Sequence, residues 1–196
     1  MGRTSHIARQ TKETDVDLTL GLDGQGHYQI ESGIPFFDHM LTAFARHGLF
    51  DLKLRCVGDL EVDAHHSVED VGIVLGSAIA QGLGDKAGIS RFGSAIVPMD
   101  EALVLCAIDI SGRGGLYYQV NLPIEFIGSF DTTLFKEFMV AVAREAKITV
   151  HLRSLAGENS HHLIEAAAKA FGLALRQAVT VDPRRGGELP TTKGSI

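Results

Sequence analysis

The sequence predicts an α+β protein built from two similar halves, in each of which two helices cover a β-sheet. The first observation is an internal repeat: the pattern His-His-x-x-Glu begins at His65 and again at His161, 96 residues later. The second is that apolar residues recur every three or four positions after each pattern, as in a helix with one buried face. The third is that runs such as 16–20 and 50–55 alternate between apolar and polar residues, as in a half-buried strand.

These patterns place the elements in the same order in both halves. The first half is expected to contain a strand at 16–20, a helix at 36–47, a strand at 50–55, a turn at Gly58-Asp59 and a long helix after 65. The second half is expected to contain strands at 103–110 and 117–122, a helix at 132–144, a strand at 148–152 and a helix at 161–179.

The repeat extends beyond the histidine pairs. Gly76 aligns with Gly172 at the same offset, whereas Ala45 aligns with Ala143 at an offset of 98 residues, so the loop before the second pair is two residues shorter. No linker rich in Pro, Gly or Ser separates the halves, so we expect one compact body. Its parts are a half-repeat over 1–92, a half-repeat over 93–182 and a substrate-binding tail over 183–196.

Composition excludes several classes of protein. The chain has 196 residues, of which 45% are hydrophobic and 21% charged, as in ordinary globular proteins. A net charge of −6 argues against nucleic-acid binding, which needs a clustered basic surface. No apolar run approaches the roughly 20 residues that cross a bilayer, and the N-terminus lacks a signal-peptide core. We therefore expect a cytoplasmic protein that binds neither nucleic acid nor membrane.

The repeated histidine pattern predicts metal binding. On a helix, residues three or four apart lie on one face, so Glu69 can share a metal with His65 or His66, and Glu165 with His161 or His162. Adjacent imidazoles point about 100° apart, so each pair is expected to divide its histidines between two metals, within one molecule or across subunits. A single pattern of this kind is weak evidence, but its recurrence in a duplicated unit is strong.

The repeat adds one candidate ligand from the first helix of each half. At the 98-residue offset His39 corresponds to Glu137, an imidazole and a carboxylate at matching places. A mixed set of imidazole and carboxylate ligands suits Mn²⁺, Fe²⁺, Co²⁺ or Zn²⁺. Structural zinc is usually closed by four ligands, whereas about eight candidates in two groups suit two metals with positions open for substrate.

Basic residues at loops and element ends predict a phosphate group on the substrate. Arg91, Arg113 and Lys193 have small residues nearby, which let a ligand approach the backbone. Lys169 lies four residues after Glu165 and hence on the face of the expected metal site, where an anion would offset the positive charge. Any one of them alone is typical of a solvated surface charge.

Two other functions fit parts of this pattern. A two-metal hydrolase acting on a small phosphorylated substrate would use its metals to activate water. A metal-storing particle similar to ferritin is the non-enzymatic alternative, but that fold is all-helical and the alternating strands argue against it.

Over essentially its whole length the sequence resembles the imidazoleglycerol-phosphate dehydratase family of histidine biosynthesis. The stretches that carry the resemblance are 9–14, 33–41, 63–70, 98–102, 109–113, 157–162 and 190–194. The resemblance implies a lyase that dehydrates D-erythro-imidazole glycerol phosphate to imidazole acetol phosphate, with two Mn²⁺ per active site that bind the substrate ring as imidazolate. It also implies a 24-subunit particle with active sites between subunits, and in each half a four-stranded sheet with two helices on one face.

The resemblance assigns roles to individual residues. One metal would be held by His65, Glu137, His161 and Glu165. The other would be held by His39, His66, Glu69 and His162. Phosphate would be bound by Arg91, Arg113, Lys169, Lys193 and the hydroxyls at Thr191-Thr192, and Glu13 would contact substrate.

Two positions depart from the family. It often has His where this chain has Glu137, which keeps coordination possible and should strengthen the binding of hard metals. The tail usually has Ser-Ser where this chain has Thr191-Thr192, and the hydroxyls are kept.

The chemistry needs a base, because the proton removed is on a carbon with no adjacent carbonyl group. Ionisation of the ring lets it expel the neighbouring hydroxyl, which leaves a diazafulvene-like intermediate. A carboxylate then takes the proton, and the resulting enol becomes the ketone. Glu13 and Glu165 are the two candidates for this base.

Overall fold

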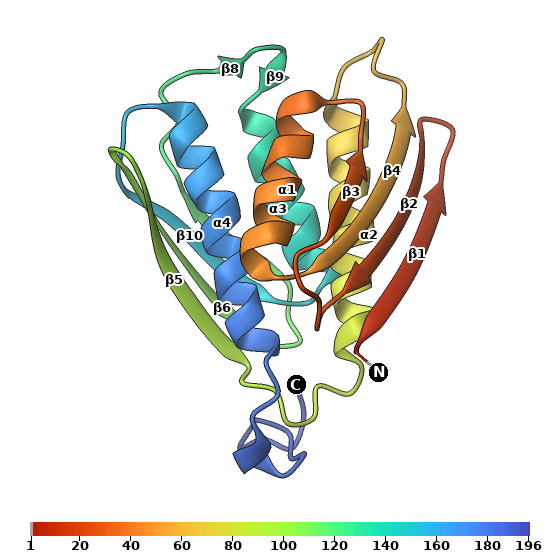
Figure 1. The fold of residues 1–196 in the computed structure, drawn as a ribbon, viewed down its shortest axis with the longest axis vertical. Helices are drawn as coiled ribbons and strands as arrows, with labels where there is room; N and C mark the ends of the chain where they lie inside the picture. The colour runs from red at the N-terminus through yellow and green to blue at the C-terminus, as the bar shows by residue number, and fades with distance from the viewer. Residues whose placement is uncertain (1) are drawn as a thin grey trace.

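The computed structural model describes residues 2–196, and in this part of the chain four α-helices lie between two four-stranded sheets (Figure 1). All four helices begin at one end of the molecule, and the C-terminal tail lies at the other (Figure 1). None of the helices described is long and apolar enough to cross a membrane. The α+β fold of duplicated halves is confirmed.

The two halves share one topology. The first is made of β1 (Thr4–Gln10), β2 (Thr14–Gly21), β3 (Tyr28–Glu31), α1 (Pro35–Gly48), β4 (Asp51–Gly58) and α2 (His65–Leu83). The second contains β5 (Phe92–Met99), β6 (Ala102–Asp109), β7 (Gly115–Gln119), β8 (Phe126–Ile127), β9 (Phe130–Asp131), α3 (Thr133–Glu145), β10 (Thr149–Ala156), α4 (Ser160–Val179) and a 3₁₀ turn at Pro183–Arg185. The strand orders, β1-β2-β4-β3 and β5-β6-β10-β7, place each strand of one sheet at the position of its counterpart in the other.

Each sheet turns one apolar face to the helices. In β2 the side chains of Val16, Leu18 and Leu20 are fully buried, while the residues between them reach the outer face. This alternation follows from the two-residue period of a strand. The helices α1 and α2 cover the first sheet, and α3 and α4 cover the second.

The halves join through their helices, because α1 packs on α4 and α2 packs on α3. A glycine allows the close approach at each contact. A Cβ atom at Gly172 would lie 2.6 Å from the carbonyl oxygen of Phe44, and one at Gly76 would lie 2.7 Å from that of Val142. The first helix of each half therefore faces the second helix of the other half.

The expected elements are confirmed apart from their ends, with one correction. The strand expected at 117–122 is β7, and it ends at Gln119. The backbone N–H of Asn121 donates to the Oγ of Ser154, so that residue is held by a side chain and not by the ladder. Strands β1, β3 and β5 were not expected from the periodicity.

Candidate functional site

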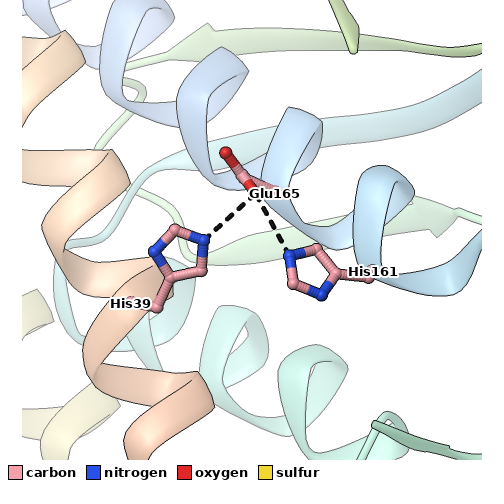
Figure 2. A group of neighbouring side chains, drawn as sticks. All are labelled: His39, His161 and Glu165. Carbon is pink, nitrogen blue, oxygen red and sulfur yellow. Dashed lines mark hydrogen bonds and ion pairs between the residues drawn. The ribbon is translucent and has the colours of Figure 1, made fainter. Parts of the chain in front are cut away.

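Three side chains that could hold a metal lie together where α1 meets α4 (Figure 2). The Nε2 of His39 is 3.1 Å from the Oε2 of Glu165, and the Nε2 of His161 is 3.3 Å from the same oxygen. One ligand atom from each residue lies within 4.8 Å of the others. The three form a set of two imidazoles and one carboxylate, the ligand chemistry of Mn²⁺, Fe²⁺ and Zn²⁺ sites.

The local sequence explains why these side chains meet. His161 and Glu165 are four residues apart and so lie on one face of α4. Asn159 caps the helix by accepting a hydrogen bond from the backbone N–H of His161, which fixes the first turn where the histidine stands. His39 approaches from the first turns of α1 because the glycine contact at Gly172 brings the two helices close.

Glu165 is buried, and both of its carboxylate oxygens have partners. Burial raises the pKa of its carboxyl, but hydrogen bonds with Lys169 and His39 outweigh this effect, so the net pKa is lowered. Lys169 contacts the other oxygen, Oε1, with its Nζ at 2.7 Å. Lys169 therefore lies on the face of α4 that carries Glu165, as its four-residue spacing predicts.

The first half contains a looser counterpart. On α2 the Nε2 of His65 is 3.8 Å from the Oε2 of Glu69, at the same four-residue spacing. Glu137 is exposed on α3, which packs on α2 as α1 packs on α4. By the repeat, His65, Glu69 and Glu137 are the counterparts of His161, Glu165 and His39.

The second histidine of each pair points in a different direction from the first. The rings of His65 and His66 are 6.2 Å apart and inclined by 87°, and those of His161 and His162 are 6.1 Å apart and inclined by 80°. The division of each pair between two directions agrees with the expectation that one ion does not take both.

His66 and His162 each stand between two carboxylates. The Nδ1 of His66 is 3.0 Å from Asp59, and its Nε2 is 3.9 Å from Glu13. The hydrogen bond with Asp59 raises the pKa of His66.

The arrangement around His162 is similar. Its Nδ1 is 2.7 Å from Glu101, and its Nε2 is 3.8 Å from Asp100. The hydrogen bond with Glu101 raises the pKa of His162 and lowers that of Glu101 to about 2.

The grouping within one chain differs from the sets that the resemblance implies. His39 was expected with His66, Glu69 and His162, but the chain places it beside His161 and Glu165. The reason is the packing of α1 on the helix of the opposite half. The eight ligands otherwise stay predictions.

The residues expected to bind phosphate lie at the other end of the molecule. Arg91, with a positive φ of 71°, donates its backbone N–H to the carbonyl of Ala178 at the end of α4. Its guanidinium bonds Asp109 and, at 2.8 Å, the carbonyl of Pro190 in the tail. Gly112, which precedes Arg113, is in close contact with Ile196, so Arg113 and the tail that carries Thr191 and Lys193 share this end.

Within a single chain, the cluster of His39, His161 and Glu165 and most of the residues expected to bind phosphate therefore lie far apart. Ala178 follows His161 by 17 positions in α4, which at 1.5 Å per residue is about 25 Å. Lys169 is the exception, since it lies beside Glu165. Glu13, in the turn between β1 and β2, also lies at the metal end, beside His66.

Asp59 and Glu101 are partners that the sequence reasoning did not assign. Asp59 was interpreted only as part of a turn, and Glu101 belonged to a matched stretch without a role. Asp59 contacts His66 from the loop that precedes α2, and Glu101 contacts His162 from the turn between β5 and β6, so neither carboxylate belongs to the repeated His-His-x-x-Glu pattern.

Comparison with known proteins identifies the family. The family profile described as imidazoleglycerol-phosphate dehydratase matches residues 32–175. The protein of that name from Moorella thermoacetica is 58% identical over 196 residues, the full length of both chains. The one from Synechococcus elongatus is 53% identical over 194 residues, which cover 99% of this chain and 93% of the relative.

Two crystal structures share the fold. Imidazoleglycerol-phosphate dehydratase from Staphylococcus aureus superposes with a TM-score of 0.83 at 37% identity, over 91% of this chain and 99% of that one. The enzyme from Pyrococcus furiosus, in complex with (S)-C348, gives 0.84 at 38% identity over 97% and 100%. The chain is therefore an enzyme of the imidazoleglycerol-phosphate dehydratase family, which serves histidine biosynthesis.

Proposed function

We propose that this chain dehydrates imidazole glycerol phosphate to imidazole acetol phosphate in the cytoplasm, with two Mn²⁺ in each active site. The observation that carries the proposal is the cluster of His39, His161 and Glu165, repeated in looser form by His65 and Glu69. Relatives along the whole length of the chain carry the name of this dehydratase. A duplicated protein with a His-His-x-x-Glu pattern in each half suits a reaction that uses two cations.

The residues present fit divalent cations. Glu165 is a buried carboxylate shared by two imidazoles and a lysine, an arrangement costly to maintain unless the site serves a ligand. The bound ions would stabilise the substrate's imidazole ring in its anionic, imidazolate form. We propose that the ligands come from His39, His65, His66, Glu69, Glu137, His161, His162 and Glu165.

Glu13 is the better candidate for the base. Glu165 already contacts His39, His161 and Lys169, which leaves its oxygens little freedom to accept a proton. The side chain of Glu13 is 55% exposed and stands beside His66 without a hydrogen bond, with 3.9 Å between Oε2 and Nε2. A carboxylate in this position can take the proton from the carbon next to the departing hydroxyl. The enol that remains gives the ketone, and one water molecule is lost.

The phosphate would be bound by residues from another copy of the chain. Arg91 bonds the carbonyl of Ala178, which lies about 25 Å from His161 along α4, far more than the length of a glycerol phosphate group, and the tail with Thr191 and Lys193 is at that same end. A site that joins both ends therefore needs self-association, which is consistent with the 24-subunit particle that the resemblance implies. Lys169 would complete the phosphate contacts from the metal end.

The test distinguishes dehydration from hydrolysis. Protein stripped of metal by a chelator is incubated with imidazole glycerol phosphate, with and without Mn²⁺, and both ketone and free phosphate are measured. Ketone formed only with Mn²⁺, and without phosphate release, supports the proposal. Release of phosphate would favour the two-metal hydrolase, and oxidative mineral deposition without ketone would favour a storage protein.

A further inference from the structure

Asp59 and Glu101 are not among the proposed metal ligands, but each contacts one ring nitrogen of a histidine that is. Asp59 presents both oxygens to the Nδ1 of His66, at 3.0 and 3.2 Å. Glu101 presents Oε2 to the Nδ1 of His162 at 2.7 Å. Because a carboxylate only accepts hydrogen bonds, each Nδ1 must carry the proton and donate it.

The other ring nitrogen is then left with its lone pair. In a neutral imidazole with a proton on Nδ1, Nε2 is the acceptor and the metal ligand. The Nε2 atoms of His66 and His162 lie 3.9 Å from Glu13 and 3.8 Å from Asp100, too far for a hydrogen bond. Among the described residues, nothing else competes for either Nε2.

Glu101 is itself fixed. Its second oxygen, Oε1, accepts the backbone N–H groups of Asn159 at 2.9 Å and Glu158 at 3.3 Å, just before α4 begins. The carboxylate thus joins the turn between β5 and β6 to the helix that carries His162. The ring of His162, which is hydrogen-bonded to this fixed carboxylate, is therefore held in one orientation.

The two carboxylates do not derive from the same position of the duplicated unit. At the 98-residue offset that relates β4 to β10, the counterpart of Asp59 is Gly157, which has no side chain. The second half supplies the carboxylate from a different element, the hairpin turn that carries Glu101. Both halves have a carboxylate that contacts Nδ1, although the two carboxylates come from different positions of the repeat. This indicates that the contact itself serves the site.

We propose that Asp59 and Glu101 are positioning residues that hold His66 and His162 in the Nδ1–H tautomer and aim each Nε2 at a metal. This inference rests on the proposed function, because it takes both histidines as ligands. Outer carboxylates that orient metal-bound histidines commonly change metal affinity by about 10- to 100-fold.

The test uses Asp59→Asn and Glu101→Gln, each with a matched control. An amide can donate its N–H₂ to Nδ1, which places the ring proton on Nε2 and blocks coordination. Glu61→Gln and Glu158→Gln remove one exposed carboxylate close to each site without touching a histidine. The Mn²⁺ affinity of the metal-stripped proteins is measured from the electron paramagnetic resonance signal of the free ion. Coordination of imidazole to the bound ion is measured from the ¹⁴N modulation of its electron spin echo.

We expect about 10- to 100-fold weaker binding at the affected site and reduced imidazole modulation in both variants, and wild-type values in both controls. Unchanged affinity and unchanged modulation in both variants would overturn the inference. Wild-type protein that binds no Mn²⁺, or shows no imidazole modulation, would instead reject the proposed function. The two carboxylates lie in different halves, so either variant alone decides the matter if the other does not fold.

Discussion

The Nε2 of His39 lies 3.1 Å from the Oε2 of Glu165, across the contact between α1 and α4. His39 belongs to the first half of the duplicated chain and Glu165 to the second. The cluster therefore depends on how the halves are packed, and neither half contains it alone. Changes in the ligands and changes in the packing should both affect the site, but in different ways.

Replacing His39 by Ala should weaken Mn²⁺ binding by at least about tenfold, because it removes one imidazole from the cluster while Glu165 keeps its lysine partner. Affinity is measured by titration of the metal-stripped protein. The control is His6→Ala, which removes an exposed histidine that pairs with Asp17. Equal affinity for both variants would exclude His39 as a ligand.

Gly172→Ala should destabilise the protein although alanine favours helices. The gain in helix propensity is about 0.5–1 kcal/mol, but the new Cβ would lie 2.6 Å from the Phe44 carbonyl oxygen, and overpacking of this kind costs about 1–3 kcal/mol. Thermal unfolding of metal-free protein measures the net effect.

The matched control for this substitution is Gly82→Ala in α2. Its nearest neighbour is the flexible end of Leu22, at 2.9 Å, which can move aside more easily than backbone. We expect a clearly smaller loss of melting temperature. A Gly172→Ala protein more stable than wild type would contradict the close packing of α1 on α4.

Much of the fold could be predicted because it depends on local patterns. The two-residue alternation around Val16 and Leu18 and the helical spacing after His65 are properties of neighbouring residues. The repeat then showed that the halves are equivalent. Strand β3, only four residues long and mostly exposed, leaves no such pattern and was missed.

The site was predicted as a set of residues but not as an arrangement. The repeat identified His39 by its counterpart Glu137, yet it could not show that α1 packs on the helix of the other half. Nor could it show that Arg91 is bound to Asp109, or that Asp59 contacts His66. The packing of α1 and the Arg91 contact depend on tertiary structure, and the Asp59 contact depends on the shape of the loop before α2; the spacing of residues encodes neither.

Coexpression of two inactive variants should restore part of the activity if each site combines two chains. His161→Ala damages the metal end, and Lys193→Ala damages the tail at the opposite end of the molecule. In mixed particles some sites receive an intact metal end from one chain and an intact tail from another. Dehydration is measured on purified mixed particles.

The control is coexpression of His161→Ala with Glu165→Gln, which damage the same cluster and should stay inactive in any mixture. Activity that remains absent for His161→Ala with Lys193→Ala, in particles shown to contain both chains, would argue that one chain forms the whole site.

Asp23 should contribute stability at neutral pH that is lost in acid. The hydrogen bond from the side chain of Arg3 is the main cause that lowers the pKa of Asp23 in the folded protein. A group whose folded pKa is depressed stabilises the fold above its unfolded value, about 3.9, and loses that effect as the pH falls through the folded value.

Asp23→Asn should therefore melt below wild type at pH 7, and the gap should shrink as the pH falls below about 4. The exposed residue Glu31, changed to Gln, controls for loss of one negative charge. Melting curves between pH 3 and pH 7 give the comparison. A gap that widens in acid would contradict the role of the Arg3–Asp23 pair.

The most direct test of the metal-dependent dehydratase is a titration of metal-stripped protein with Mn²⁺ in which bound ion and ketone formation are followed in the same sample. We expect the rate to rise with bound Mn²⁺ and to level off at two ions per chain. A rate that is already full without added metal in protein shown to be metal-free would contradict it, as would binding of two ions per chain with no ketone formed.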